Sequence, residues 1–383
     1  MSVFSKIAKF KKSLETPFDT LNNINISKDA ILNNIDVFKK LHPSWSIFPV
    51  LKSNAYWHWI TQVAKILKSV KLDYIVADSY FEALKIHEVN KTPVLLIGYT
   101  LPVNLKNMDF SNIALTVYDL ETLNELAEIG REVRIHLKID SGMHRQWIYF
   151  EDIVKYVEII KANPFIKLEW VCTHFADADS TDDGYSEIQQ EYFHKCVVFL
   201  KARWFKLKYI HADNSAASAK WFWEGVCNSM RLGISLYWVN PLESGDKNFS
   251  KLEKLKLVLS LTSTIILTKD LKKWDKVSYN GTFTADKDMR IWVVPVGYYE
   301  ALSRKLSNNY FYTFGKNKLP VLGRVCMNLT VVDVTWTDIK VWDQIDVISA
   351  AWANDIYELS KRSETITYEC FTRLAESIRR NMV

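Results

Sequence analysis

Glycine is scarce in this chain of 383 residues. There are 11 glycines, whereas an average usage of about 7% would give roughly 27. Such a count excludes a collagen-like chain or a glycine-rich chain of low complexity. Tryptophan is correspondingly abundant, with 14 residues, and the positions of the tryptophans explain both imbalances.

Cysteine and an excess of one charge are also lacking. Five cysteines without a CxxC pair exclude a disulfide-knotted mini-protein and indicate reduced thiols and a cytoplasmic location. Basic residues number 49 and acidic residues 44, an excess too small to argue for nucleic acid. The basic N-terminus lacks the apolar segment of a signal peptide, and no apolar run approaches the ~20 residues that span a bilayer. We therefore expect no membrane partner.

Several motifs that carry chemistry are missing. The chain has no HExxH, no CxxC and no spaced set of carboxylates, so no metal site is predicted. It has no GxGxxG and no Walker A loop, which leaves a dinucleotide or nucleoside triphosphate site without support. Composition does not exclude a Ser–His–Asp hydrolase, but the GxSxG elbow of such enzymes is absent.

Short apolar segments rich in branched residues alternate with segments of helical spacing over residues 27–240. Ser27 is predicted to cap the first helix, with Asp29 in its first turn. Eight strand–helix units within about 200 residues are typical of a parallel (β/α)₈ barrel of the TIM type, an α/β fold, rather than of an open sheet. The predicted strands are Ile47–Leu51, Tyr74–Ala77, Val94–Ile97, Ile113–Val117, Val133–Ile139, Leu168–Thr173, Lys208–Ala212 and Leu232–Leu236.

The pattern changes at the segment PLESGDK, which begins at residue 241 and is typical of a linker. Beyond it, strand-like runs follow one another without long helices, which predicts a mostly antiparallel β domain over 241–383, closed by a helix around Tyr368–Arg380. The barrel domain is predicted over 27–240, and residues 1–26 are predicted as an N-terminal segment that packs on the β domain. The predicted strands are Leu257–Leu267, Val277–Ala285, Arg290–Val296, Val321–Val325, Leu329–Val334 and Ile345–Ser349.

In a barrel of this type, the reacting groups stand at the C-terminal ends of the strands. The first predicted strand ends at Lys52, in the sequence Phe-Pro-Val-Leu-Lys. A lysine beside so many apolar residues is partly desolvated, which lowers the pKa of its amine and suits an imine-forming or general-base role. Taken alone, Lys52 is more typical of a strand-end lysine that extends its charge to solvent.

Other polar residues follow the later strands. Hydroxyls and glycine-exposed amides after strands seven and eight suit a phosphate. A lysine at one position of the barrel mouth and a phosphate cradle at another indicate pyridoxal phosphate (PLP) bound as an imine. The strand-end residues are Lys138, Asp140 and Arg145 for the fifth strand, His174 for the sixth, His211, Asn214 and Ser215 for the seventh, and Arg231, Gly233 and Ile234 for the eighth.

These residues resemble the motifs of the alanine racemase family, which are PLP enzymes with a barrel and a β domain. The resemblance covers about residues 20 to 380. It rests on eight motifs that occur in family order across both domains, and no single motif would carry it. The motifs are Lys52-Ser-Asn-Ala-Tyr56, Lys138-Ile-Asp-Ser-Gly-Met-His-Arg145, Thr173-His174-Phe-Ala, Asn214-Ser215-Ala, Arg231-Leu-Gly233-Ile234, Val277-Ser-Tyr279, Pro295-Val-Gly-Tyr298 and Gly323-Arg-Val-Cys-Met327.

The resemblance implies interconversion of L-alanine and D-alanine by two bases, supplying D-alanine for peptidoglycan. Lys52 would hold the cofactor and act on one face of the substrate Cα. Tyr279 would act on the opposite face, since racemisation needs an acid/base group on each side of a planar carbanion. The family places this tyrosine across a head-to-tail interface, so a homodimer is implied.

The resemblance also implies the remaining contacts. Arg231 would face the pyridine nitrogen and keep the ring unprotonated, which suppresses transamination, and with His174 it would tune the phenol of Tyr279. In the family, a lysine at the position of Lys138 can be carbamylated and so orient the arginine that matches Arg145. The implied binding residues are Tyr56, Asn214, Ser215, Gly233 and Ile234 for the cofactor, Arg145 and the Met327 amide for the substrate carboxylate, and Tyr298 at an entrance narrow enough to favour alanine.

Other reactions stay open. The alternatives are a racemase of serine or another small amino acid, a fold-related decarboxylase, and a non-catalytic PLP-binding homologue. A decarboxylase is expected to place a carboxylate, rather than Arg231, against the pyridine nitrogen. The β domain and Tyr279 count against a non-catalytic carrier.

Three positions depart from the family pattern besides the tryptophans. Asn328 stands where many members have aspartate, and Ala301 stands where glycine is common. Near the C-terminus the family has a phosphate-binding tyrosine. Glu376 is the nearest residue in the alignment, so this tyrosine is predicted to be missing and the phosphate to be bound more weakly or by another donor.

Tryptophan stands at many family glycine positions. The family's Ala-Tyr-Gly-His-Gly is Ala-Tyr56-Trp57-His58-Trp59 here, and Trp274 lies in a predicted turn that needs glycine. A bulky side chain at a left-handed position is an outlier. Our hypothesis is that many of these residues are glycine in the native protein, through an opal codon decoded as glycine, and the alternatives are a naturally tryptophan-rich racemase or a pseudoenzyme. The further matches are Trp147, Trp170, Trp238, Trp292 and Trp342.

Overall fold

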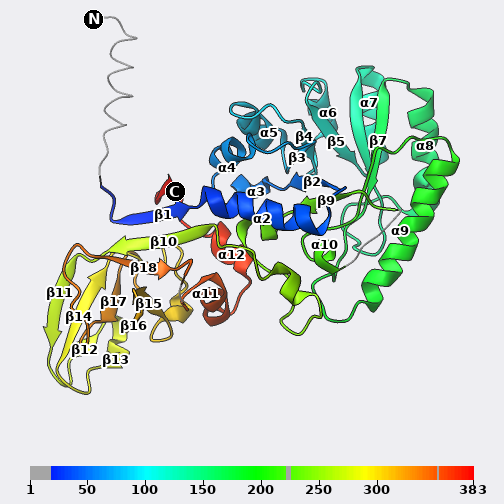
Figure 1. The fold of residues 1–383 in the computed structure, drawn as a ribbon. Helices are drawn as coiled ribbons and strands as arrows, with labels where there is room; N and C mark the ends of the chain where they lie inside the picture. Colours follow the sequence, from blue (N-terminus) through cyan, green and yellow to red (C-terminus); the bar gives the residue numbers. More distant parts are fainter. Residues whose placement is uncertain (1–18, 221–225, 352) are drawn as a thin grey trace, which may run out of the picture. The chain divides into compact units, whose positions relative to one another are not determined.

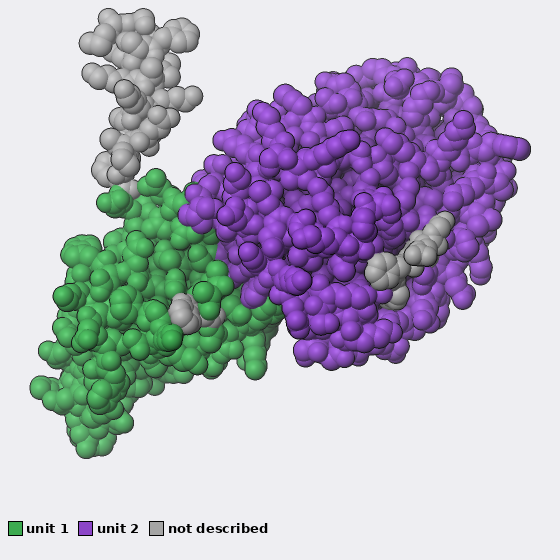
Figure 2. Space-filling model, viewed as in Figure 1, with its two compact units in different colours: residues 1–25, 260–366, 373–381 green, residues 26–259, 367–372, 382–383 purple. Residues whose placement is uncertain are grey.

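The computed structural model describes residues 19–220, 226–351 and 353–383, which divide into two compact units (Figure 2). We call them the barrel unit and the β unit. Residues 241–259, which the sequence predicts as a linker and the start of the β domain, belong to the barrel unit. The barrel unit comprises residues 26–259, 367–372 and 382–383, and the β unit comprises residues up to 25, 260–366 and 373–381.

The described residues of the barrel unit form eight parallel strands, which confirms the predicted (β/α)₈ fold. Strands β3 to β8 form one parallel sheet in sequence order, and β2 pairs in parallel with β9. A parallel bridge between Val50 and Val76 joins the end of β2 to β3, and the amide of Asn228 donates to the carbonyl of Ile210 (3.1 Å), which connects β9 to β8. The strands are β2 (Ser46–Pro49), β3 (Ile75–Ala77), β4 (Val94–Leu96), β5 (Ile113–Val117), β6 (Val133–Lys138), β7 (Ile166–Cys172), β8 (Tyr209–His211) and β9 (Ser229–Leu232).

Helices follow the strands and lie around the outside of the barrel (Figure 1). The Ser27 hydroxyl accepts a hydrogen bond from the amide of Ala30 (3.2 Å) and so caps α2 as predicted. Asp119 caps α7 in the same way, and Gly130 ends it in the left-handed conformation. The helices are α2 (Lys28–Leu41), α3 (Lys52–Tyr56), α4 (Ile60–Leu67), α5 (Tyr80–His87), α6 (Pro102–Leu105), α7 (Leu120–Ile129), α8 (Ile153–Ala162), α9 (Gly184–Ala202), α10 (Ala217–Lys220) and α12 (Thr367–Thr372).

Most residues of the barrel strands are buried, because helices or other side chains cover both of their faces. All five residues of β5 are buried. One cluster at the barrel centre includes Phe48, Tyr74, Trp170 and Tyr209, and the rings of Phe48 and Trp170 stack with centroids 4.9 Å apart. Each large side chain buried in this way contributes about 1.5–3 kcal/mol. This core fixes the strand ends, where the predicted site residues stand.

The predicted eighth barrel strand and the predicted C-terminal helix are wrong in position. The eighth strand is β9 rather than Leu232–Leu236, because the chain leaves the extended conformation at Gly233 and continues as the 3₁₀ helix η2 (Ile234–Tyr237). The C-terminal helix ends early, at Thr372. The guanidinium of Arg380 donates to the carbonyls of Ala375 (3.2 Å) and Ile378 (2.9 Å), which stabilises a turn, and β19 (Arg379–Met382) follows it.

The β unit contains a nine-stranded, mostly antiparallel sheet in the order β11-β14-β17-β16-β15-β18-β10-β1-β19. The sequence missed the hairpin of β15 and β16, which turns at Gly315 (φ 53°), and placed a strand at 321–325 instead. Within the predicted N-terminal segment, β1 belongs to this sheet, and residues 1–18 lie outside the described residues. The strands are β1 (Asn22–Ile26), β10 (Leu259–Thr264), β11 (Leu267–Leu271), β12 (Lys276–Val277), β13 (Phe283–Thr284), β14 (Met289–Val294), β15 (Phe311–Phe314), β16 (Asn317–Leu322), β17 (Thr330–Asp333) and β18 (Gln344–Ile348), with α11 (Ile356–Ser363) after them.

In the described part of the chain, helices of the length and apolar character needed to cross a membrane are absent.

Candidate active site

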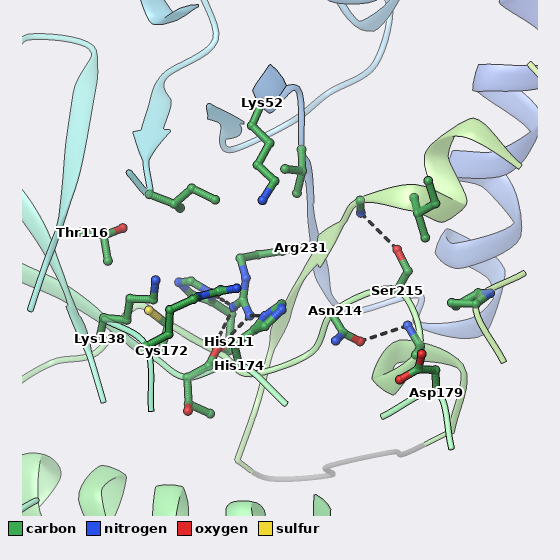
Figure 3. A pocket seen from close by; sticks show the side chains of 18 of the residues that line it. Lys52, Thr116, Lys138, Cys172, His174, Asp179, His211, Asn214, Ser215 and Arg231 are labelled. Atoms are coloured by element: carbon green, nitrogen blue, oxygen red, sulfur yellow. Dashed lines mark hydrogen bonds between the residues drawn. The ribbon is translucent and has the colours of Figure 1, made fainter. Parts of the chain in front are cut away.

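The C-terminal ends of the barrel strands surround a cavity of about 260 Å³ (Figure 3). Ten of the thirteen predicted site residues line it, and all of them belong to the barrel unit. Chain order alone brings them together, since parallel strands of one barrel all end at the same mouth. The ten are Lys52, Tyr56, Lys138, Arg145, His174, Asn214, Ser215, Arg231, Gly233 and Ile234.

Lys52 begins a left-handed turn that is unusual for residues with side chains. Ser53, Asn54, Ala55 and Tyr56 all have φ between 50° and 58°. Each such residue costs about 1–2 kcal/mol. Hydrogen bonds hold the turn, because the Asn54 amide donates to a carboxylate oxygen of Glu82 (3.0 Å) and the Asn54 side chain accepts from the amide of Ile60 (2.9 Å). Backbone strain of this kind is typical of functional sites.

Burial lowers the pKa of the Lys52 amine, and the charges of Arg145 and Arg231 act in the same direction, against Asp78 and Glu82. This is the desolvation that the sequence predicts for a lysine after an apolar strand. A lowered pKa leaves more of the neutral amine, which is the form that attacks a carbonyl or accepts a proton.

Lys138 lies at the end of β6, with its ammonium 3.9 Å from the ring centroid of Trp147 and 5.5 Å from that of Tyr118. Burial lowers its pKa to about 8; Cys172 opposes this, while the charges of Arg231, Arg145 and Lys52 lower it further. The pocket therefore gathers several cations on one side, and this side suits a carboxylate.

The pKa of Lys138 predicts how stability depends on pH. In the unfolded chain Lys138 titrates near 10.5, so between pH 8 and pH 10.5 the folded state binds fewer protons than the unfolded state. The free energy of unfolding therefore rises with pH in this window, by about 1.4 kcal/mol per pH unit and roughly 3 kcal/mol in total. Urea unfolding at pH 7.5 and 9.5 should show the rise in the unsubstituted chain, and a smaller rise in Lys138→Met. Equal slopes for the two proteins would contradict the prediction.

Arg231, on β9, is held in one orientation by five hydrogen bonds. Its Nη2 donates to the carbonyls of Thr173 (2.8 Å) and Ala212 (2.9 Å) and to Nδ1 of His174 (3.0 Å). Its Nη1 donates to the carbonyl of His211 (2.9 Å) and to Nδ1 of the same residue. Burial lowers the pKa of the guanidinium. Such a buried, rigid cation presents a fixed charge to whatever occupies the cavity.

The guanidinium also decides the tautomers of three histidines, because it can only donate. His174 and His211 must accept at Nδ1 and therefore carry their proton on Nε2. Nε2 of His211 then donates to Nδ1 of His136 (3.2 Å), whose own Nε2 has no partner among the described residues. Burial, and after it the charge of Arg231, lowers the pKa of all three rings well below the ordinary value. The histidines are therefore neutral acceptors that orient Arg231.

A small polar cradle lies at the other side of the cavity. The Ser215 hydroxyl accepts from the amides of Gly233 (3.1 Å) and Ser235 (3.3 Å). A Cβ atom at position 233 would come within 3.0 Å of the Tyr56 hydroxyl and 3.9 Å of Ser215 Oγ. Glycine is therefore needed for the close approach, and the space it leaves, edged by two hydroxyls and an amide, fits a phosphate.

Tyr368 is a pocket residue that the sequence missed. It lies on α12 in the barrel unit, and its ring centroid is 6.1 Å from that of Tyr56. Burial raises the pKa of its hydroxyl to about 12, so it stays a donor. Glu376, the residue aligned with the family tyrosine, does not line the cavity. The sequence Thr-Tyr-Glu after the last predicted β strand was the available signal, but the predicted long helix obscured it.

The remaining three predicted residues belong to the β unit and stand on adjoining segments. Tyr279, Tyr298 and Met327 are 68%, 43% and 55% exposed. The amide of Tyr298 donates to the carbonyl of Cys326 (3.0 Å), and the Ser278 hydroxyl donates to the carbonyl of Arg324 (2.8 Å).

Gly297 and the predicted departure Asn328 share one partner. The Glu300 carboxylate accepts from the Gly297 amide (2.7 Å) and from the side-chain amide of Asn328 (3.0 Å). An aspartate at 328 would instead repel the carboxylate of Glu300, so asparagine fits this chain. A Cβ at position 297 would lie 2.3 Å from the carbonyl oxygen of Cys326, so only glycine allows this approach.

The chain combines a parallel barrel with an antiparallel β unit that follows it. The mouth of the barrel holds a desolvated lysine and a cradle that fits a phosphate. These features define a class of two-domain enzymes whose reactive amine lies at the barrel mouth. The chain belongs to the alanine racemase family. The family models "Alanine racemase, N-terminal domain" and "Alanine racemase, C-terminal domain" match residues 26–241 and 258–382.

Individual relatives agree over nearly the whole chain. The alanine racemase of Leptospira interrogans serogroup Icterohaemorrhagiae serovar copenhageni (strain Fiocruz L1-130) is 33% identical over 376 residues, which cover 94% of this chain and 95% of the relative. That of Borreliella burgdorferi (strain ZS7) is 28% identical over 361 residues, covering 92% and 95%. The solved structure of alanine racemase from Clostridium difficile 630 superposes with a TM-score of 0.87 at 27% identity and covers 96% of both chains. The resemblance stated from the sequence motifs is thereby confirmed at the level of the family.

Proposed function

We propose that this chain interconverts L-alanine and D-alanine with PLP bound at the barrel mouth, and that it supplies D-alanine for peptidoglycan. One observation carries the proposal: the Lys52 amine, the rigid Arg231 guanidinium and the cradle at Ser215 and Gly233 line a single cavity. These three features match the carbonyl, the ring and the phosphate of PLP. When bound, PLP would withdraw electrons from the substrate and so acidify its Cα–H bond.

The residues would share the work as follows. Tyr56, Ser215, Tyr368 and the amides of Gly233 and Ile234 would hold the phosphate, with Asn214 supporting this loop through its bonds to the amides of Ala216 and Ala217 (both 3.0 Å). Arg231, oriented by His174 and His211, would keep a positive charge at the ring nitrogen and prevent its protonation.

Proton transfer would involve two bases, one from the barrel unit and one from the β unit of a second copy of the chain. Lys52, with its lowered pKa, would take or return the proton on one face of the substrate Cα. Tyr279 of a second copy would serve the opposite face, since the exposure of its side chain leaves it available to a partner. Arg145 and the Met327 amide would bind the substrate carboxylate, and Tyr298 would limit the substrate to the size of alanine.

A neutral Lys138 would also be able to add carbon dioxide as a carbamate. Its pKa near 8 provides the uncharged amine at mildly alkaline pH. The resulting anion would orient Arg145 toward the substrate, as implied for the family. Cys172, Cys196, Cys227 and Cys326 are outside disulfides, which supports a reducing, cytoplasmic location.

The first experiment is reductive trapping on protein from the native source. Borohydride followed by tryptic digestion and mass spectrometry is expected to show a pyridoxyl phosphate adduct on Lys52. A racemisation assay with alanine and serine then ranks the substrates. An unmodified Lys52 would refute the proposal and favour a non-catalytic homologue, whereas faster turnover of serine would favour a racemase of another amino acid.

We also propose that glycine is the native residue at several of the tryptophans, through an opal codon decoded as glycine. The backbone supports six positions, at which φ lies between 68° and 98°, a region that costs a bulky residue about 1–2 kcal/mol. Trp204, which the sequence did not single out, is among them, and it follows the C-cap residue Arg203 of α9, a position where glycine is the usual helix terminator. The six are Trp57, Trp59, Trp204, Trp238, Trp274 and Trp342.

The same backbone argument extends to one alanine, but not to the remaining tryptophans that match family glycines. Ala301, at a position where family members often have glycine, also has a positive φ of 92°. Trp147, Trp170 and Trp292 do not, so only the alignment favours glycine there. Trp170 and Trp292 are fully buried, and their indole N–H groups find no partner among the described residues. The mass spectrum of the trapped peptide also reads positions 57 and 59, and tryptophan at both would overturn this proposal.

A further inference from the structure

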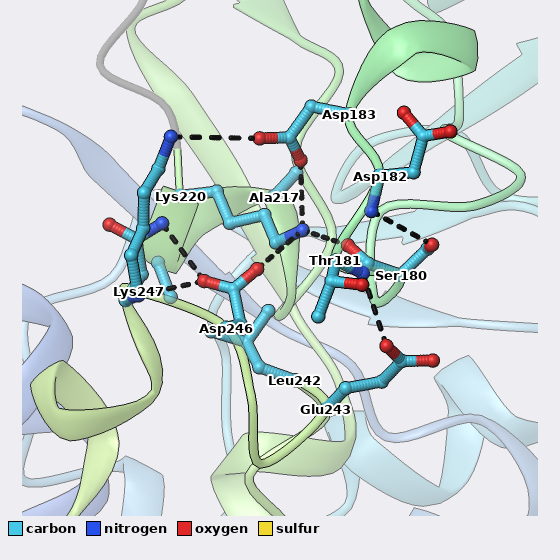
Figure 4. A network of polar contacts seen from close by, with 12 residues as sticks. Ser180, Thr181, Asp182, Asp183, Ala217, Lys220, Leu242, Glu243, Asp246 and Lys247 are labelled. Atoms are coloured by element: carbon cyan, nitrogen blue, oxygen red, sulfur yellow. Dashed lines mark hydrogen bonds and ion pairs between the residues drawn. The ribbon is translucent and has the colours of Figure 1, made fainter.

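A fully buried ammonium joins several loops of the barrel unit (Figure 4). Lys220 ends α10, and its side chain is 0% exposed. Its Nζ donates to Oδ1 of Asp183 (2.9 Å), to Oδ2 of Asp246 (2.8 Å) and to the carbonyl oxygen of Ser180. None of these residues takes part in the proposed chemistry.

Each segment joined by Lys220 also contributes to the wall of the cavity. The loop after β7 contributes Asp179, the segment before α10 contributes Ser215 and Ala216, and the loop after η2 contributes Pro241. Two of these loops also contact each other directly, since the amide of Glu243 donates to the carbonyl of Asp179 (3.2 Å). One ammonium therefore fixes three neighbouring parts of the wall.

Ser215 lies two residues before α10, and the four described residues of this helix are too few to be stable by themselves. Side chains from elsewhere in the unit hold its carbonyl groups: Nε2 of His42 lies 2.6 Å from the oxygen of Ser218, and Nζ of Lys251 lies 3.1 Å from that of Ala219. Lys220 anchors the last residue of the same turn. The position of the Ser215 hydroxyl therefore rests on contacts made at the far end of α10.

Burying an ammonium costs solvation, so such a contact is weak evidence for stability but can specify one geometry. Although burial opposes it, hydrogen bonding to Asp183 and Asp246 raises the pKa of Lys220, so it is charged at neutral pH. Asp246 is itself oriented by the amide of Asn248 (2.7 Å), and Lys247 approaches Asp183 to 4.0 Å. The hydrogen bonds and ion pairs of this network thus define a single arrangement of Lys220, Asp183 and Asp246.

We propose that Lys220 is a positioning residue of the phosphate cradle, which sets Ser215 and the adjoining loops before the cofactor binds. The inference rests on the proposed function, because the phosphate in question is that of PLP. It predicts that Lys220 affects the binding of the phosphate group and not the binding of the pyridine ring.

Titration of the full-length apoprotein with PLP and with pyridoxal, which lacks the phosphate, tests the proposal. Lys220→Met is expected to weaken PLP binding about tenfold, a loss typical of removing an outer residue that orients a binding group, and to leave pyridoxal binding unchanged. Lys220→Arg, which keeps the charge and the donors, is expected to restore most of the affinity. Lys155→Met, which breaks the exposed ion pair with Asp152, is the matched control and should bind both compounds normally.

Two further variants keep the outcomes distinct. Tyr368→Phe and Ser215→Ala remove groups of the cradle itself and should also weaken PLP more than pyridoxal. The role of Lys220 is refuted, and the proposed function stands, if these two variants weaken PLP more than pyridoxal while Lys220→Met weakens neither. The same conclusion follows if Lys220→Met weakens the binding of both compounds equally. If none of the three discriminates between the compounds, the cradle itself is wrong. If Lys220→Met fails to fold, Asp183→Asn, which retains Lys220 and Asp246, is expected to show a smaller loss that is again confined to PLP, and an equal loss for both compounds would refute the role.

Discussion

Lys52→Ala is expected to lower the rate of alanine racemisation by about 10⁴-fold or more. The variant loses the amine that would hold the cofactor and the group that would move a proton at the substrate Cα. General acid–base catalysis alone contributes about 10²–10⁴-fold, and the loss of the covalent anchor adds to this.

The measurement is a coupled D-alanine assay on purified protein, with Lys65→Ala as the control. Lys65 lies on the exposed face of α4, so its removal should leave the rate unchanged. Added methylamine should restore part of the activity of Lys52→Ala, because it supplies an amine to the vacated site. Residual activity within tenfold of the unsubstituted chain would contradict the assignment of Lys52.

Glycine at three exposed tryptophans is expected to raise the free energy of unfolding by about 2 kcal/mol in total. Trp204, Trp274 and Trp342 are 90%, 70% and 70% exposed, so their indoles contribute little packing. Each left-handed residue costs about 1–2 kcal/mol, from which the greater chain entropy of glycine subtracts about 0.5–1 kcal/mol. A total of this size is a large part of the 5–15 kcal/mol that stabilises a typical domain. The chain made with tryptophan throughout is therefore expected to fold poorly and to show little activity.

Denaturant unfolding of the triple variant and of the starting chain checks this expectation. Trp336→Gly is the matched control, because Trp336 is 80% exposed but is not among the residues with positive φ. Glycine there should leave stability unchanged or lower it. Equal effects of the control and the three test positions would show that exposure, and not backbone geometry, is responsible.

Most of the barrel site could be predicted from the sequence. The apolar segments mark the strands, and the polar residue after each segment marks a strand end. Because parallel strands end at one mouth, the order of Lys52, Lys138, His174 and Arg231 along the chain is enough to place them around one cavity. No knowledge of long-range contacts is needed for this step, and errors of a few residues, as in the eighth strand, do not change which residues face the mouth.

Tyr368 shows where this reasoning ends. It follows strands β10 to β18 of the β unit in the chain, yet α12 belongs to the barrel unit and places its ring beside that of Tyr56. Local spacing predicts a helix in this region but carries no information about which unit the helix joins. The same holds for the contacts of Lys220, whose partners Asp183 and Asp246 lie on two separate loops.

The sequence by itself determined the barrel and the β domain, and it predicted the imine lysine and the glycine positions now held by tryptophan, because all of these are encoded in local periodicity, in strand ends and in residue identity. Only the tertiary structure decided which backbone positions are left-handed, how the histidines orient Arg231, that Tyr368 lines the cavity, and that Lys220 joins the loops around it. These features depend on contacts between segments far apart in the chain, and such contacts arise only when packing brings the segments together.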